Sequence, residues 1–292
     1  MLKSIFVPMN GNETDELVLG TALAMAQIFE SHLECVRVRM STDYLVWESN
    51  LLDAVSGLIE GDLISQLEQQ DRERTTSALR IFKKFCGREK IAISDTPPGP
   101  VGVSARWQEM RGHQVSTFQQ EARFHDLVVV ARSLLADTDP GADFAGNILL
   151  GCGRPILLAP AEPPKTLGKT IAIAWKNSPE AARAVSAAMP ILAQAEKVIV
   201  MCAPEDDMPE EALEESGRKL ASTLRWNGCN AETFLVYDDG APARNVLDQA
   251  RRLDVDLLVM GGYGHSRLRE TVFGGFTKDI LIHSPLPVFM FH

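Results

Sequence analysis

The sequence has no apolar run near the ~20 residues that a membrane-spanning helix needs, and no excess of basic residues. Its net charge of −10 and pI near 5.2 argue against nucleic acid or an anionic membrane as the main partner. Five scattered cysteines form no C-x-x-C pair, which favours reduced, buried thiols over a zinc or redox site. The opening apolar run is too short for a signal peptide, so we expect a cytoplasmic protein.

Catalytic signatures are also missing. The sequence holds no Gly-x-Ser-x-Gly elbow, no complete Walker motif and no His-Glu-x-x-His, and no cluster of residues typical of a catalytic metal site. His265 and Ser266 are adjacent, which by itself does not indicate a nucleophile and its base. We therefore predict no catalytic residues and, at most, slow hydrolysis of a bound nucleotide.

The chain of 292 residues is about twice the usual domain size and has a hydrophobic fraction of 45%, so two globular domains are expected. An internal repeat supports this. The stretch from Lys169 to Ser178 repeats the stretch from Lys3 to Asn12 at an offset of 166, and 255–260 repeats 125–130 at an offset of 130. We predict domains at 1–160 and 168–292, joined by a proline-rich linker.

Each repeat alternates strands and helices with short links, which predicts a parallel sheet. Asn12 and Ser178 are the expected caps of the first helix in each half, with Pro179 at the first helical position of the second. The expected strands are 3–8, 33–38, 101–107, 125–130 and 155–158, then 169–174, 198–202, 233–237, 255–260 and 287–291. The long helices are expected at 61–86 and 209–226.

The falling offset leaves 36 more residues in the first half than in the second. Part of this surplus, Tyr44 to Ile59 within an insertion near 41–61, has apolar residues at helical spacing. It predicts an added amphipathic helix, for which surface packing and a functional lid are both open.

The stretch Gly261–Thr277, GGYGHSRLRETVFGGFT, follows a predicted buried strand and leads into a predicted helix, Phe276 to His283. Gly261 and Gly264 would let the backbone turn and expose its N–H groups, as would Gly274 and Gly275 before the helix. Glycines at a strand end and a helix start are typical of a phosphate cradle, because side chains would block the approach of the anion. They would also serve a tight turn that binds nothing.

The second half resembles the universal stress protein family. The resemblance rests on Gly261-x-x-Gly264, nine residues, then Gly274, and on the frames 240–243, 256–261 and 284–288 around it. The first half matches the family only in strand and helix order, since Ala131-Arg132-Ser133-Leu134 replaces the glycine loop. The whole chain therefore resembles a tandem member with one motif-bearing and one degenerate domain.

The resemblance implies two doubly wound, Rossmann-like α/β domains of the adenine nucleotide alpha hydrolase type, each a five-stranded parallel sheet of order 3-2-1-4-5. Ligands of such sheets bind where the strand order reverses, at the carboxyl ends of strands one and four. The implied ligand is ATP or another adenine nucleotide, with which Mg²⁺ could bind. Its implied contacts are Ala174, Trp175, Lys176, Gly261, Gly264, His265, Ser266, Gly274, Gly275, Phe276 and Thr277.

Two positions depart from the family pattern. The family has Ser or Thr after the last motif glycine, where this chain has Gly275, and an adenine-recognising Asp where it has Lys176. Lysine offers only donors, so Lys176 suits a phosphate better than the amine of adenine. Trp175 could stack on a base or cover the core.

The leading hypothesis is a nucleotide-binding sensor or regulator of the stress response. The alternative is a scaffold that binds no nucleotide. The last strands of both halves would leave open sheet edges, which the family pairs with each other. We therefore expect the two domains to form an internal pseudo-dimer, with a homodimer of whole chains as a further option.

Overall fold

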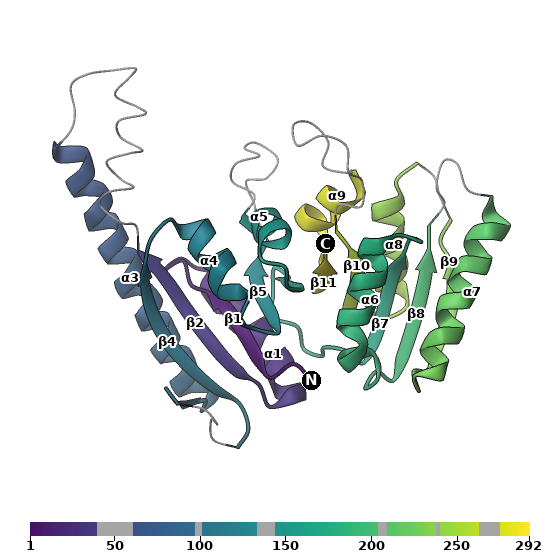
Figure 1. Ribbon diagram of the computed structural model, residues 1–292, viewed down its shortest axis with the longest axis horizontal. Helices are drawn as coiled ribbons and strands as arrows, with labels where there is room; N and C mark the ends of the chain where they lie inside the picture. The colour runs from purple at the N-terminus through teal and green to yellow at the C-terminus, as the bar shows by residue number, and fades with distance from the viewer. Residues whose placement is uncertain (40–60, 97–100, 133–143, 204–208, 238–239, 263–274) are drawn as a thin grey trace. The chain divides into compact units, whose positions relative to one another are not determined.

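A computed structural model describes residues 1–39, 61–96, 101–132, 144–203, 209–237, 240–262 and 275–292. These residues form two compact units, Leu2–Val129 and Val130–His292, and the second unit also includes Met1. Each unit is an α/β structure in which helices pack on a sheet (Figure 1). The expected helix from Tyr44 to Ile59 lies outside the described residues.

The first unit contains a parallel sheet in the order β3-β4-β2-β1-β5. Leaving out β3 at its edge, this is the predicted order 3-2-1-4. The two-residue strand β3 was not predicted, because two exposed residues are too few to show a hydrophobic periodicity. The described strands are β1 (Ser4–Pro8), β2 (His32–Arg39), β3 (Ala92–Ile93), β4 (Ser104–Arg111) and β5 (Leu127–Ala131), and the helices are α1 (Thr14–Phe29), α3 (Gly61–Glu89) and α4 (Gln114–Ala122).

Helices cover both faces of this sheet. On one face the ring of Phe6 meets that of Phe118 in α4, with ring centroids 6.0 Å apart. On the other face Trp107 meets Phe82 in α3 at 5.6 Å. Phe6, Phe82 and Phe118 are all fully buried, so the core consists of two apolar layers with the sheet between them.

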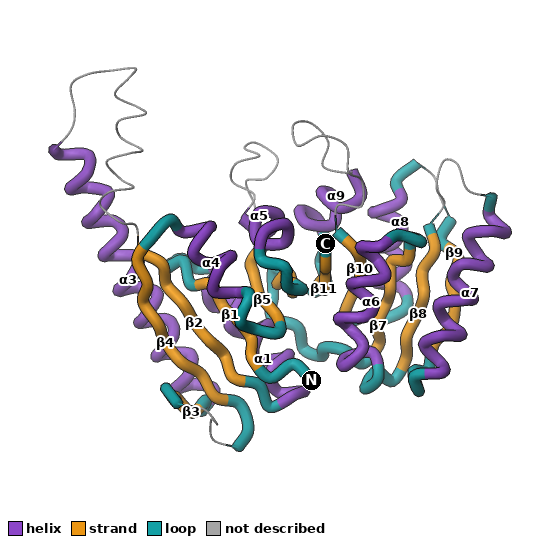
Figure 2. Tube along the Cα trace, viewed as in Figure 1, coloured by secondary structure: helices purple, strands orange, loops and turns teal. Residues whose placement is uncertain are grey.

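The second unit has the strand order β6-β11-β10-β7-β8-β9. From β9 to β11 all pairings are parallel and the predicted order 3-2-1-4-5 is confirmed. Figure 2 shows these strands beside one another, with helices packed against them. The described elements are α5 (Phe144–Gly151), β6 (Ile156–Ala159), β7 (Thr170–Trp175), α6 (Pro179–Leu192), β8 (Lys197–Cys202), α7 (Glu210–Trp226), β9 (Ala231–Leu235), α8 (Pro242–Arg252), β10 (Leu257–Gly261), α9 (Gly275–His283) and β11 (Val288–Phe291).

The last strand of the first repeat pairs with the last strand of the second. β6 runs antiparallel to β11, with Leu157 opposite Phe289, and both residues are fully buried. This pairing places α5 and β6 in the second compact unit. The repeat boundaries at 1–160 and 168–292 remain a prediction, whereas compactness divides the chain near Val130.

An aspartate at the equivalent position anchors the start of each repeat. Asp126 accepts hydrogen bonds from the main-chain N–H groups of Lys3 and Ser4, at 2.8 and 3.0 Å. Asp256 accepts from the N–H groups of 168–170, at 3.0 to 3.2 Å. In each half a carboxylate therefore ties the start of strand one to the start of strand four.

Helix starts follow the local sequence. The Ser178 hydroxyl accepts from the N–H of Ala181 at 3.3 Å, which confirms the predicted cap of α6. The predicted cap Asn12 is wrong by one position, because α1 begins at Thr14 and its N-cap residue is Glu13; Asn12 lies two residues before the helix and accepts from the N–H and hydroxyl of Thr14. The third strand of the first half was predicted at 101–107, but β4 begins at Ser104 and continues to Arg111 because it pairs with the whole length of β2.

Candidate functional site

In the second unit the strand order reverses between β7 and β10, which lie side by side. The register pairs Met260 with Ala174, so both strands end at the same edge of the sheet. Ala174 and Trp175 are half-buried there and Lys176 is exposed. Since α9 connects the parallel strands β10 and β11, its first turn also lies at this carboxyl edge. Three predicted site segments thus meet at one edge.

Gly261 is required here by packing. A Cβ atom at this position would lie 2.5 Å from the main-chain nitrogen of Ala181 and 2.7 Å from the carbonyl carbon of Glu180. The first turn of α6 therefore lies directly against the end of β10. Sequence reasoning assigned this glycine to a ligand, but the described contacts already account for it.

Gly262 is buried and equally constrained. Its N–H donates to the carbonyl of Phe291 at 2.9 Å, which extends the β10–β11 ladder by one bond. A Cβ atom there would lie 2.6 Å from Cδ2 of Leu149 in α5. This close fit lets a helix from the first repeat pack against the edge of the second sheet.

The indole of Trp175 is held by α7. Its Nε1 donates to the hydroxyl of Ser216 at 2.9 Å, and the ring is half-buried. Two roles were predicted for Trp175, covering the core and stacking on a base. The hydrogen bond to Ser216 holds the indole against α7, as the first role requires. Stacking on a base remains a prediction.

The start of α9 is open. Gly275 is exposed, and among the described residues a Cβ atom built there meets nothing within 4 Å, unlike the one at Gly261. Phe276 is half-buried, and Thr277 is 7% exposed. First-turn N–H groups have no partners within their own helix, so an anion could bind here. The predicted site residues Gly264, His265, Ser266 and Gly274 lie outside the described residues.

Sequence reasoning missed a carboxylate in the first turn of α6. One oxygen of Glu180 accepts from Arg183 at 3.0 Å, and the other, Oε2, is buried without a donor among the described residues. Burial raises the pKa of Glu180, but its own N–H, the Ser178 hydroxyl, Arg183 and His292 together bring the pKa below its ordinary value. An acid following Ser-Pro at a helix start was the available signal.

A partial Walker motif was also passed over. The tripeptide Gly168-Lys169-Thr170 has the last three residues of the motif, but Pro163 stands where the motif requires its first glycine. All three N–H groups donate to Asp256 at the amino end of the sheet. They are therefore unavailable to a phosphate.

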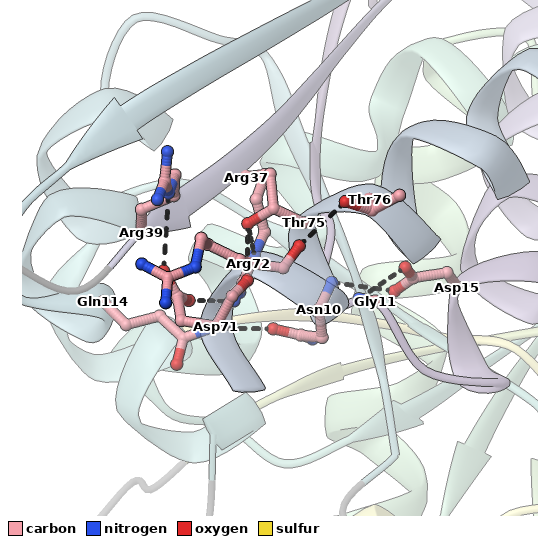
Figure 3. Close-up of polar contacts among 10 residues, drawn as sticks. All are labelled: Asn10, Gly11, Asp15, Arg37, Arg39, Asp71, Arg72, Thr75, Thr76 and Gln114. Carbon is pink, nitrogen blue, oxygen red and sulfur yellow. Dashed lines mark hydrogen bonds and ion pairs between the residues drawn. The ribbon is translucent and has the colours of Figure 1, made fainter. Parts of the chain in front are cut away.

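In the first unit the corresponding edge is occupied by the chain itself (Figure 3). Asn10, which follows β1, accepts from the side-chain amide of Gln114 at 2.9 Å. Gly11 has a φ of +79°, and a Cβ atom there would overlap the carbonyl oxygen of Arg74 in α3. Close packing of α3 and the Asn10–Gln114 bond therefore fill the space after the carboxyl end of β1.

Asp15 completes this closure. Its carboxylate accepts from the main-chain N–H groups of Asn10 and Gly11, at 2.9 and 2.8 Å, and is 1% exposed. Burial raises its pKa, against the opposing effect of the two N–H groups and of Arg37. These N–H groups, which an anion could otherwise use, are already satisfied by a side chain.

The described residues offer neither a metal cluster nor a membrane span. Within the described parts of the chain, His, Cys, Asp and Glu side chains nowhere gather in groups of three that could hold a metal ion. The five cysteines are free and buried. None of the helices that the structure describes is long and apolar enough to cross a membrane.

Comparison with known proteins supports the family. The universal stress protein family model matches residues 168–292. A segment of 82 residues is 34% identical to a universal stress protein of Synechocystis sp., covering 28% of this chain and 24% of that protein. A segment of 83 residues is 26% identical to the stress response protein NhaX of Bacillus subtilis, covering 28% of this chain and 46% of NhaX. The matches thus span less than half the length of either relative.

The fold is matched over the whole chain. A universal stress protein from Archaeoglobus fulgidus superposes with a TM-score of 0.69 at 13% identity, covering 99% of this chain and 95% of the other. At this identity the likeness concerns the fold, and it includes the first half, which lacks the glycine loop. Residues 168–292 therefore belong to the universal stress protein family, and the chain as a whole has the fold of a solved universal stress protein.

Proposed function

We propose that residues 168–292 bind an adenine nucleotide at the carboxyl edge of β7 and β10, and that the protein acts as a sensor or regulator of the stress response. The observation that carries the proposal is the open first residue of α9. Gly275 has free space on its Cβ side, whereas Gly261 and Gly262 at the same edge are tightly packed. A glycine without a packing role, at a helix start beside a strand-order reversal, is explained by close approach of a phosphate.

The described residues support binding of the phosphates of a nucleotide better than recognition of its base. The Lys176 side chain can only donate hydrogen bonds, which suits the negatively charged phosphate oxygens of a nucleotide. Lys176, the residue that follows β7, carries no side-chain acceptor for the amine of adenine, and the main chain of Glu180 lies against the end of β10 at Gly261. We therefore expect the nucleotide to be held mainly through its phosphates, with weak discrimination among bases.

The test is calorimetric titration of ATP, ADP and AMP into the purified chain and into two variants at one position. Gly275→Glu places a negative charge against the phosphates, while Gly275→Gln has the same size without the charge. Because the position is open, both should fold like the parent. Like charges in contact cost several kcal/mol, so the glutamate should weaken ATP binding at least about tenfold, and the glutamine much less.

Several results would overturn the proposal: no binding heat from any of the three nucleotides to folded protein, or equal affinities for both variants. The first would favour the scaffold function, for which the pairing of β6 with β11 is the relevant observation. Slow ATP hydrolysis is the third candidate. Release of ADP over hours, lost in a folded Gly264→Val variant, would support it.

A further inference from the structure

The first unit contains a buried charge cluster at the carboxyl ends of β2 and β4, on the face that α3 covers (Figure 3). A guanidinium nitrogen of Arg37 lies 2.6 Å from Oδ1 of Asp71, and the two side chains are 4% and 9% exposed. Nε of Arg39, two residues further along β2, lies 3.5 Å from Oδ2 of the same carboxylate. Thr75, one turn after Asp71, contacts Nε of Arg37 at 3.5 Å. One carboxylate therefore serves two guanidinium groups.

Arg39 is left incompletely satisfied. Its Nε is buried and donates no hydrogen bond to any of the described residues. Asp71, 3.5 Å away, forms an ion pair with this nitrogen but does not accept a hydrogen bond from it. The side chain as a whole is 29% exposed, so solvent reaches the rest of the guanidinium group. A buried N–H without an acceptor is costly, and such a group commonly binds a water or an ion.

A third arginine lies beside Arg39. The parallel register places Arg111 of β4 opposite Arg39, and residues in register point to the same face of a sheet. Arg111 is exposed, and its side chain has no hydrogen bond or ion pair within the part of the chain that the structure describes. The acids around these groups are Asp71, Glu109 and Asp15, of which Glu109 is exposed and also accepts from Trp107, and Asp15 acts on Arg37 together with the positive charge of Arg74. Four guanidinium groups thus face three carboxylates, in a chain whose net charge is −10.

The fold does not require these charges. In the second unit the register puts Cys202 at the place of Arg37, and Gly217 of α7 packs against its sulfur. Both halves form the same strand–helix interface, one with apolar groups and one with arginines. Since replacing a buried ion pair by apolar groups is often neutral or stabilising, the arginines of the first half call for another role.

We propose that Arg39 and Arg111 form an oxyanion-binding site for a phosphate group, at the carboxyl ends of β2 and β4 of the first unit. Asp71, which is paired with Arg37, orients Arg39 through its second oxygen. The guanidinium fork matches two oxygens of a phosphate, which would supply the missing acceptor for Nε of Arg39. The site is separate from the β1 edge that Asp15 and Gln114 close, and it is independent of nucleotide binding in the second half.

The test is nuclear magnetic resonance of the arginine Nε–H groups in the full chain, titrated with inorganic phosphate at constant ionic strength. The Arg39 signal, assigned by its loss in Arg39→Gln, should shift along a saturating curve with phosphate and not with chloride. In Arg111→Gln the affinity should fall by about tenfold, the equivalent of one charge-assisted hydrogen bond. Arg80→Gln removes an exposed charge elsewhere on α3 and should leave the curve unchanged.

Repeating the titration with AMP identifies the source of the phosphate. Equal affinity for phosphate and AMP indicates a site for the free anion, and tighter binding of AMP indicates a nucleotide phosphate; both support the site. A shift that is linear, equal in chloride, or unaffected by Arg111→Gln overturns it. An Arg39 signal that does not move at all also overturns it, because the Nε then has another acceptor.

Discussion

The contact of Gly261 with α6 gives the sharpest prediction for the second unit. A methyl group at this position would lie 2.5 Å from the nitrogen of Ala181, where ordinary contacts are 3.4–4 Å. The three nearest atoms are all main-chain atoms of α6, so no side-chain rotation can relieve the overlap. Either the first turn of α6 or the end of β10 must therefore move by about 1 Å, which is a typical overpacking strain.

Overpacking of this kind costs about 1–3 kcal/mol, and we expect Gly261→Ala near 3 kcal/mol because the clash is with backbone. For a unit of this size that corresponds to a fall in Tm of about 6–12 °C. Gly275→Ala is the matched control at the same edge. Its new methyl group meets nothing within 4 Å, so its stability should stay within about 0.5 kcal/mol of the parent.

The measurement is urea unfolding of both variants, followed by far-ultraviolet circular dichroism and by tryptophan fluorescence. Trp175 lies at the end of β7, next to the affected strand, and its bond to Ser216 makes it a local reporter. Equal midpoints for Gly261→Ala and Gly275→Ala would refute the packing argument. The first glycine of the motif would then be explained by ligand contact alone.

Two further predictions concern buried charges. Asp71→Ala leaves Arg37 buried and unpaired, so it should lower the free energy of unfolding in urea by about 3–5 kcal/mol. The double variant Arg37→Met with Asp71→Leu should recover most of this loss. A loss under about 1 kcal/mol for Asp71→Ala alone would contradict the argument. The lowered pKa of Glu180 means that its stabilisation is present above the unfolded pKa of about 4.3 and is lost as the pH falls through the folded value. The stability difference between the parent and Glu180→Gln should therefore shrink from pH 7 to pH 3.5, and a growing difference would contradict it.

The candidate site was only partly readable from the sequence. The glycine spacing located the edge and the helix start, because turn and helix-start chemistry is local. The pattern gave no way to distinguish Gly261, which packs against α6, from Gly275, which faces open space. That distinction depends on which helix crosses the strand end, and the helix is about 80 residues away in the chain.

The sequence by itself determined the repeat and the alternation of strands and helices, which follow from hydrophobic periodicity, capping residues and short links between neighbouring residues. The strand order and the place where it reverses came from the resemblance to the universal stress protein family. Only the tertiary structure decided that the first half closes its own edge through Asp15, Asn10 and Gln114, and that Arg39 lies with Arg37 around Asp71. Such contacts join side chains from separate elements, and their distances are fixed by packing that no local pattern records.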